Sequence, residues 1–217
     1  MVQRPFYPEG AACHVYVLHP PGGVVGGDRL VLDVDVASGA HAVITTPASA
    51  KFYRSAGPLA TQQQRLHVAQ HGILEWLPQE TIFFAGCQVD TSTHVNMAVG
   101  ARFIGAEVVC LGRPASGERF EAGRCRQRLE IWREEQPLII ERAALEGGHP
   151  ILTERWGLAG STVMGALIAT PVGKAELQAV RSTVQTPDSL FSATLLGDVL
   201  LCRYLGHRAE QARRVFT

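Results

Sequence analysis

The strongest constraint on the fold is a pattern that occurs four times between residues 30 and 141. Each copy is a strand-like stretch, a short turn of small or polar residues, and a second strand-like stretch; the copies span 30–46, 64–77, 94–111 and 128–141. The first stretch alternates apolar and polar residues, as in a half-buried strand, whereas the second is more uniformly apolar, which indicates burial on both faces. Stacking such units predicts a mainly β fold, a layered or coiled stack of β-hairpins similar to a β-helix.

The pattern changes after about residue 150. Residues 161–170 predict a strand, 174–181 a helix, 189–196 and 199–205 two strands, and 209–216 a second helix. We therefore expect two parts in one structural unit: a β body over 1–150, and a small α+β portion with two helices, over 151–217, packed on it. The 22 glycines and 12 prolines also favour a turn-rich β protein over a helical bundle.

Charge and cysteine content exclude several classes of protein. Lys and Arg together number 20, as do Asp and Glu, so no net charge attracts nucleic acid or an anionic membrane. No run of 18 apolar residues predicts a membrane span, and the start has no apolar segment typical of a signal peptide. The five cysteines form no C-x-x-C pair, which favours reduced thiols and a cytoplasmic location.

A loop rich in glycine and proline, His19 to Asp28, precedes the first repeat. A phosphate-binding P-loop would need Lys and then Ser or Thr after its last glycine, but Asp28 and Arg29 stand there. The glycine spacing also misses a dinucleotide-binding fingerprint, and a strand-like run follows instead of a helix. The residues alone leave this segment open between a structural turn and a functional loop.

Acidic residues inside apolar stretches are the main chemical signal. Glu75, Glu107 and Glu141 each lie within or directly after such a run. One interpretation is that the strands have a solvated face, or that each acid pairs with an arginine such as Arg54, Arg113 or Arg142. The other is a polar seam through the β body that passes a divalent cation, since hard carboxylates suit transient contact with one. No H-E-x-x-H or G-x-S-x-G motif supports a hydrolase, and we expect a protein that is not an enzyme.

Several blocks resemble one known family, the urease accessory protein UreD, also called UreH. The blocks are Arg4–Glu9, Cys13–Tyr16, His19–Asp28, Lys51–Ser55, Leu74–Glu80 and Leu111–Pro114, in this order along the chain. The resemblance implies a mainly β scaffold that binds the urease apoprotein and, with UreF and the GTPase UreG, installs the dinuclear nickel centre. It implies a heterocomplex, with dimerisation through UreF as one form, and no permanently bound cofactor, only Ni(II) in transit. Family members usually carry further residues before the first block and after the last helix, so shortened ends are expected.

The resemblance also suggests site residues. By position, Asp28, Glu107 and Glu141 resemble acids along an internal nickel route. Residues expected to contact partner proteins are Lys51, Tyr53, Arg54, Trp76 and Glu80. The alternative is a pure docking scaffold that never contacts nickel, in which the loops with these motifs only dock partner proteins.

Overall fold

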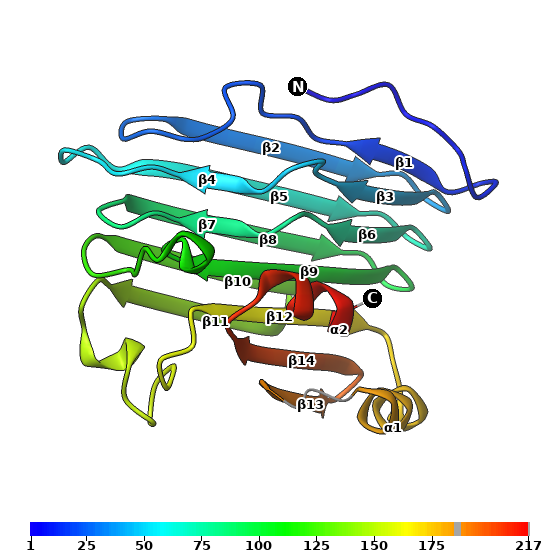
Figure 1. The fold of residues 1–217 in the computed structure, drawn as a ribbon. Helices are drawn as coiled ribbons and strands as arrows, with labels where there is room; N and C mark the ends of the chain where they lie inside the picture. Colours follow the sequence, from blue (N-terminus) through cyan, green and yellow to red (C-terminus); the bar gives the residue numbers. More distant parts are fainter. Residues whose placement is uncertain (185–187, 217) are drawn as a thin grey trace.

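Two β-sheets face each other, and the chain steps repeatedly from one to the other (Figure 1). The computed structural model describes residues 1–184 and 188–216. The five-stranded sheet has the order β11 (Gln136–Glu146), β10 (Arg124–Arg133), β8 (Gln88–Met97), β5 (Ala60–Val68) and β2 (Arg29–Val36). The nine-stranded sheet has the order β1 (Cys13–Tyr16), β3 (His41–Thr45), β6 (Ile73–Leu77), β9 (Arg102–Leu111), β12 (Val163–Thr170), β14 (Val199–Gly206) and β13 (Leu190–Leu196), with the short strands β4 (Ala50–Phe52) and β7 (Thr81–Phe83) also paired into it.

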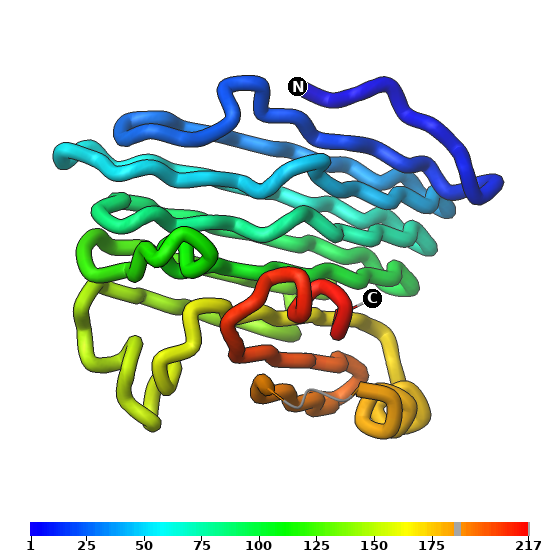
Figure 2. Tube along the Cα trace, in the orientation of Figure 1, coloured from blue at the N-terminus to red at the C-terminus, as the bar shows by residue number. Residues whose placement is uncertain are grey.

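The predicted units are the coils of a solenoid. In the first three, the first stretch lies in the five-stranded sheet and the second in the nine-stranded sheet, and the corresponding strands of these three coils pair in parallel. Figure 2 shows these coils stacked in sequence order. The mainly β, β-helix-like fold is thus confirmed. The two stretches of one coil do not pair with each other, because the exposed turn between them leads from one sheet to the other. In the fourth unit they do pair, as the antiparallel hairpin β10–β11 within one sheet.

The interior between the sheets is apolar at both ends of the strands and polar in the middle. One buried cluster includes Leu66, Val95 and Trp76, and the other includes Phe52 and Val89. Strand β8 contributes Val95 and Met97 to the first cluster and Val89 to the second, and the inward positions between Val89 and Val95 are threonines. Because inward side chains recur every second residue, the alternation in the sequence leads directly to this polar band.

The C-terminal part extends the nine-stranded sheet and covers its outer face. Strand β12 pairs antiparallel with both β9 and β14. Helix α1 (Lys174–Thr183) packs beside β13, and helix α2 (Ala209–Phe216) packs against β9, β12 and β14. The predicted order strand, helix, strand, strand, helix is present. The division of the chain at residue 150 stays a prediction, and β12 joins β9 in a single sheet.

Candidate functional site

A pocket of about 350 Å³ opens where the last strand of the five-stranded sheet meets β12 and β14. It contains two of the predicted acids, Glu107 from β9 and Glu141 from β11, together with Arg203 from β14. These side chains come from both sheets. Glu107 belongs to the polar band, and Glu141 lies at its end, so the pocket is where the band reaches the surface.

Glu107 is held by a short chain of hydrogen-bonding groups. Its Oε1 lies 2.6 Å from the hydroxyl of Thr93, and that hydroxyl lies 2.7 Å from Oε1 of Gln64. A threonine hydroxyl has one proton and can donate to only one of these two oxygens. Either Glu107 carries a proton that it donates to Thr93, or the Gln64 amide is turned so that its NH₂ group donates. The arrangement crosses the interior, since Thr93 is buried in the five-stranded sheet.

Burial raises the pKa of the Glu107 carboxyl above its ordinary value of 4.5. The hydrogen bond from Thr93 opposes this shift, and the negative charge of Glu141 adds to it. The residue as a whole is partly exposed, but the carboxyl group points inward between the sheets. Glu107 is therefore a carboxyl group that a nearby cation would help to ionise.

Glu141 already has a cationic partner, because Arg203 donates to its carboxylate. The Arg203 side chain is half-exposed, whereas that of Glu141 is more buried. Sequence reasoning missed Arg203 and suggested Arg54, Arg113 or Arg142 as partners. The available signal was the alternation along β14, which places Arg203 on the same face as the core residue Leu201. The structure also gives Glu75 a histidine partner, since His41 Nε2 lies 2.7 Å from its Oε1.

Two carboxylates beside a guanidinium do not make a resident metal site. In residues 1–184 and 188–216, no group of three or more His, Cys, Asp or Glu side chains is placed to hold a metal ion. Carboxylate oxygens do suit brief contact with a divalent ion, provided that Arg203 moves away from Glu141. With two carboxylates, the donor set of the pocket is too small to bind a metal ion tightly.

The third predicted acid, Asp28, lies apart from this pocket. Its Oδ2 accepts a hydrogen bond of 3.0 Å from the backbone N–H of Val25, which closes the turn before β2. It does not line the pocket of Glu107 and Glu141. The glycines of this loop allow close approach to the next coil: a Cβ at Gly23 would overlap the Tyr53 ring, and one at Gly26 would overlap the Ser55 hydroxyl.

The loops that carry the family motifs stack at one corner of the solenoid. Tyr53, which packs on Gly23, makes an edge-to-face contact with Phe84 at 4.9 Å between ring centroids. The guanidinium of Arg113 lies 4.7 Å above the Phe84 ring. Lys51, in β4, and Arg54 belong to the same corner, and Arg54 packs against Gly86 of the following coil. Phe84 and Arg113 were not predicted as contact residues, although Arg113 lies in one of the motifs.

The two remaining predicted contact residues are less accessible. Trp76 is a core residue with 2% of its surface exposed, so in this fold a partner cannot reach its ring. Glu80 accepts hydrogen bonds from Ser49 and from Arg213 of α2, and thereby fastens the helix to the β6–β7 connection. A substitution at either residue would act first on the packing of this chain.

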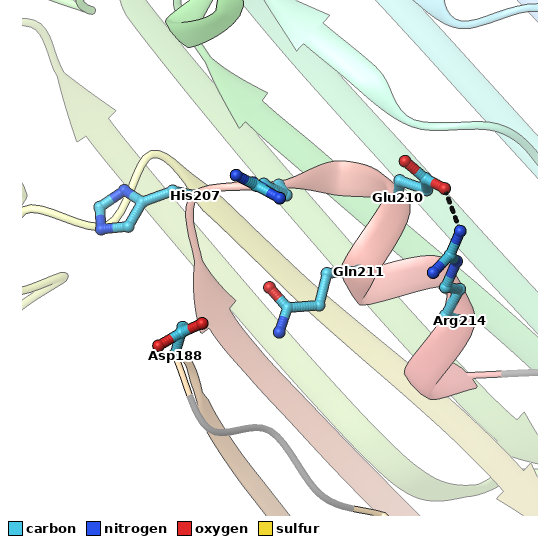
Figure 3. Close-up of a pocket in the computed structure, with 6 residues that line it drawn as sticks. Asp188, His207, Glu210, Gln211 and Arg214 are labelled. Atoms are coloured by element: carbon cyan, nitrogen blue, oxygen red, sulfur yellow. Dashed lines mark hydrogen bonds and ion pairs between the residues drawn. The ribbon is translucent and has the colours of Figure 1, made fainter.

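A second pocket, of about 540 Å³, lies beside the start of α2 and contains none of the predicted site residues (Figure 3). Its lining includes Asp188, His207 and Gln211, and the Glu210–Arg214 ion pair of the helix borders it. Within the described residues, no helix has both the length and the apolar character needed to cross a membrane.

Fold and pocket together define a class: a parallel β-solenoid whose apolar interior contains a polar band that ends in an acid-containing pocket between the two sheets. A family model described as "UreD urease accessory protein" matches residues 1–217. The chain belongs to the UreD urease accessory protein family.

Individual relatives agree with this assignment. The urease accessory protein UreD of Pseudomonas entomophila is 46% identical over 214 residues, which cover 99% of this chain and 76% of the relative. The protein of the same name from Citrobacter koseri is 43% identical over 216 residues, covering 99% of this chain and 73% of the relative. That from Dechloromonas aromatica is 43% identical over 221 residues, covering 99% and 77%.

Proposed function

We propose that this chain is a urease maturation factor. It would act in the cytoplasm as a scaffold that binds the urease apoprotein and, with UreF and UreG, enables GTP-dependent insertion of the dinuclear nickel centre. Membership of the UreD family supports this role, since the relatives are named urease accessory proteins. The role is not enzymatic.

The finer part of the proposal concerns nickel. Ni(II) would pass through the polar band between the sheets and contact Glu107 and Glu141 in transit. The observation that supports this most directly is the convergence of these two acids, from opposite sheets, on one pocket. Arg203 would hold Glu141 while no ion is present. Asp28 would contact the ion at a different point of the route, because its carboxylate closes a turn outside this pocket.

Complementation of a strain that lacks this gene tests the proposal. Replacing both acids, Glu107→Gln with Glu141→Gln, should reduce urease activity and urease nickel content by about tenfold or more, with the accessory complex still assembled. Glu146→Gln is the matched control, since Glu146 is an exposed acid on the same strand as Glu141. Wild-type nickel content in the double variant would exclude the nickel route. Full urease activity without the gene would exclude the maturation role itself.

The stacked corner of Tyr53, Phe84 and Arg113 favours a second candidate, a docking scaffold without nickel contact. Aromatic and arginine side chains are the residues that most often dominate protein interfaces. In that case Lys51→Glu together with Arg54→Glu should abolish capture of the partner proteins, while the Glu107→Gln and Glu141→Gln pair leaves urease maturation unchanged. The two candidates therefore predict opposite results for the acid variants.

A further inference from the structure

On the side of the C-terminal strands, the nine-stranded sheet extends one strand beyond the five-stranded sheet. The last strand of the five-stranded sheet, β11, faces β14, as the Glu141–Arg203 ion pair shows. The nine-stranded sheet continues by one more strand, β13, which appears at the bottom of Figure 1. No described strand of the other sheet faces β13, so its inner face is bare.

That bare face has an exposed leucine at each end and two polar residues, Ser192 and Thr194, between them. Leu196 pairs in register with Val199, and Thr194 with Leu201, and both partners belong to the buried core between the sheets. On β13 the same face carries Leu190, which is 64% exposed, and Leu196, which is 48% exposed. We call this face of β13 the shelf: two large apolar side chains meet water there beside the buried core, and such exposed apolar residues are a common mark of an interaction site.

The strand next to this shelf has a free edge. Among the described residues β11 pairs only with β10, so its other edge offers unpaired backbone N–H and C=O groups. Proteins usually protect such an edge with lysine, a bulge or a covering segment. Strand β11 has no lysine, and both its single proline, Pro137, and its register shift against Ile131 and Trp132 of β10 lie near its start, so the rest of the edge is unprotected.

We propose that an extended segment of a partner protein adds to β11 as a sixth strand of the five-stranded sheet. Its inward side chains would be apolar and would cover Leu190 and Leu196 on the shelf. Main-chain hydrogen bonds to β11 would provide affinity, as in other cases of strand addition. The segment would also cover the pocket of Glu107 and Glu141, because Arg142 and Ala143 of β11 are among the residues that line this pocket. The choice of partner, one of the urease maturation proteins, rests on the proposed function.

Charge specifies the outward side of the segment. Arg142 is exposed and stands directly opposite Arg128 of β10 in the register. Arg128 lies 3.8 Å from Glu130, whereas Arg142 has no ion pair within the described residues. Like charges directly opposite each other on a sheet are unfavourable, and an acid on the next strand would compensate. The segment should therefore alternate apolar residues with polar ones, including Asp or Glu opposite Arg142.

Strand β13 extends beyond β11, and this extension favours a single added segment over a second copy of this chain. A two-fold axis perpendicular to the sheet would join two β11 strands edge to edge and would keep both nine-stranded sheets on the same side. Each β13 would then occupy the space of the other copy's β14. A single strand avoids this overlap, since it occupies only the slot beneath β13.

Two substitutions on the shelf test the proposal: Leu190→Asp with Leu196→Asp. The matched control is Val31→Asp with Val99→Asp, which places the same charges at exposed valines far from the shelf, with 45% and 61% exposure. The probes are purified urease apoprotein, UreF and UreG of the same organism. We expect the shelf variant to bind about tenfold or more weakly and the control to bind like wild type. Circular dichroism should show that both variants are folded.

Amide hydrogen exchange identifies the edge itself. Amides of Gln136–Glu146 should exchange more slowly in the complex than in the free chain. Unchanged exchange there in a complex that forms, or wild-type affinity of the shelf variant, would overturn the proposal and leave the maturation role intact. If the free chain is a dimer and the shelf substitutions convert it to a monomer, the occupant of the shelf is a second copy of this chain and not a segment of a partner protein. If urease matures fully without the gene, the proposed function fails, and the partner named here fails with it.

Discussion

Thr93 of β8 and Glu107 of β9 meet across the interior, with the Thr93 hydroxyl 2.6 Å from Glu107 Oε1. These residues belong to the two stretches of one coil and lie in opposite sheets. The contact places an acid in the polar middle of the solenoid, between two apolar clusters. A carboxyl group in this position is sensitive to charge, because little water reaches it to stabilise the ionised form.

Glu107→Gln should stabilise the protein above about pH 6 by on the order of 1 kcal/mol. Burial raises the pKa of Glu107 in the folded chain, so above pH 4.5 the unfolded chain loses this proton while the folded chain keeps it. Folding then takes up a proton, and the free energy of unfolding falls as pH rises until the folded pKa is passed. Glutamine keeps the shape without the charge and removes this fall. Urea unfolding from pH 4 to pH 9 measures it; parallel curves for both proteins would contradict the argument.

Arg203→Gln should increase the affinity of the chain for Ni(II), by about three- to tenfold. The substitution removes the cation that occupies Glu141 and leaves two carboxylates to attract a divalent ion. A unit charge about 4 Å away is worth on the order of 1 kcal/mol even when well solvated. Isothermal titration calorimetry with Ni(II) measures the change, and Arg203→Lys, which keeps the charge, is the control. Equal affinity in the glutamine and lysine variants would show that Arg203 does not compete with the ion.

The cysteines give an independent check on the fold. Burial raises the pKa of Cys87 and Cys125 to about 12, and that of Cys110 and Cys202 to about 11. Only Cys13 among the five free thiols is partly exposed. Because the thiolate is the reactive form, a thiol reagent at pH 8 should modify about one cysteine per native chain and all five in urea. Rapid modification of several thiols under native conditions would mean that the sheets open more easily than described.

Much of the solenoid could be predicted from alternation alone. Apolar residues at alternate positions, such as Leu66 and Val95, predict which face of each strand is buried. The turn residues between the stretches predict where the chain turns at the corners of the solenoid. The partner of each strand could not be predicted, because a strand–turn–strand unit has the same pattern whether the turn makes a hairpin or crosses to another sheet. The parallel pairing of β2 with β5 depends on contacts between coils, which no local pattern records.

The site was predictable only in part, for a related reason. Glu107 and Glu141 were recognisable as acids in apolar runs, but their meeting in one pocket depends on which strands face each other. The alternation along β14 places Arg203 on the inward face, but Arg203 lies 62 residues from Glu141 in the sequence and no local pattern identifies Glu141 as its partner. Trp76 was expected at a partner interface because of its motif, yet its position on β6 faces the core.

Gly23→Ala should destabilise the corner by about 1–3 kcal/mol, because the added methyl group would overlap the Tyr53 ring. The effect should depend on that ring. In a Tyr53→Ala background the same glycine substitution should cost much less, which a double-mutant cycle by urea unfolding measures. Equal costs in both backgrounds would place the strain in the backbone of the 19–28 loop instead of in the contact with Tyr53.

Trp76→Ala should lower the free energy of unfolding by about 3–5 kcal/mol, since it empties a large volume of core. Trp156→Ala should change it by less than about 0.5 kcal/mol, because Trp156 is 68% exposed in the β11–β12 connection. Urea unfolding followed by circular dichroism compares the two. Loss of partner capture in the Trp76 variant would then reflect loss of fold. If Trp76→Ala instead keeps wild-type stability and still loses the partner, the ring must reach the interface in the complex, and the core at β6 must open when the partner binds.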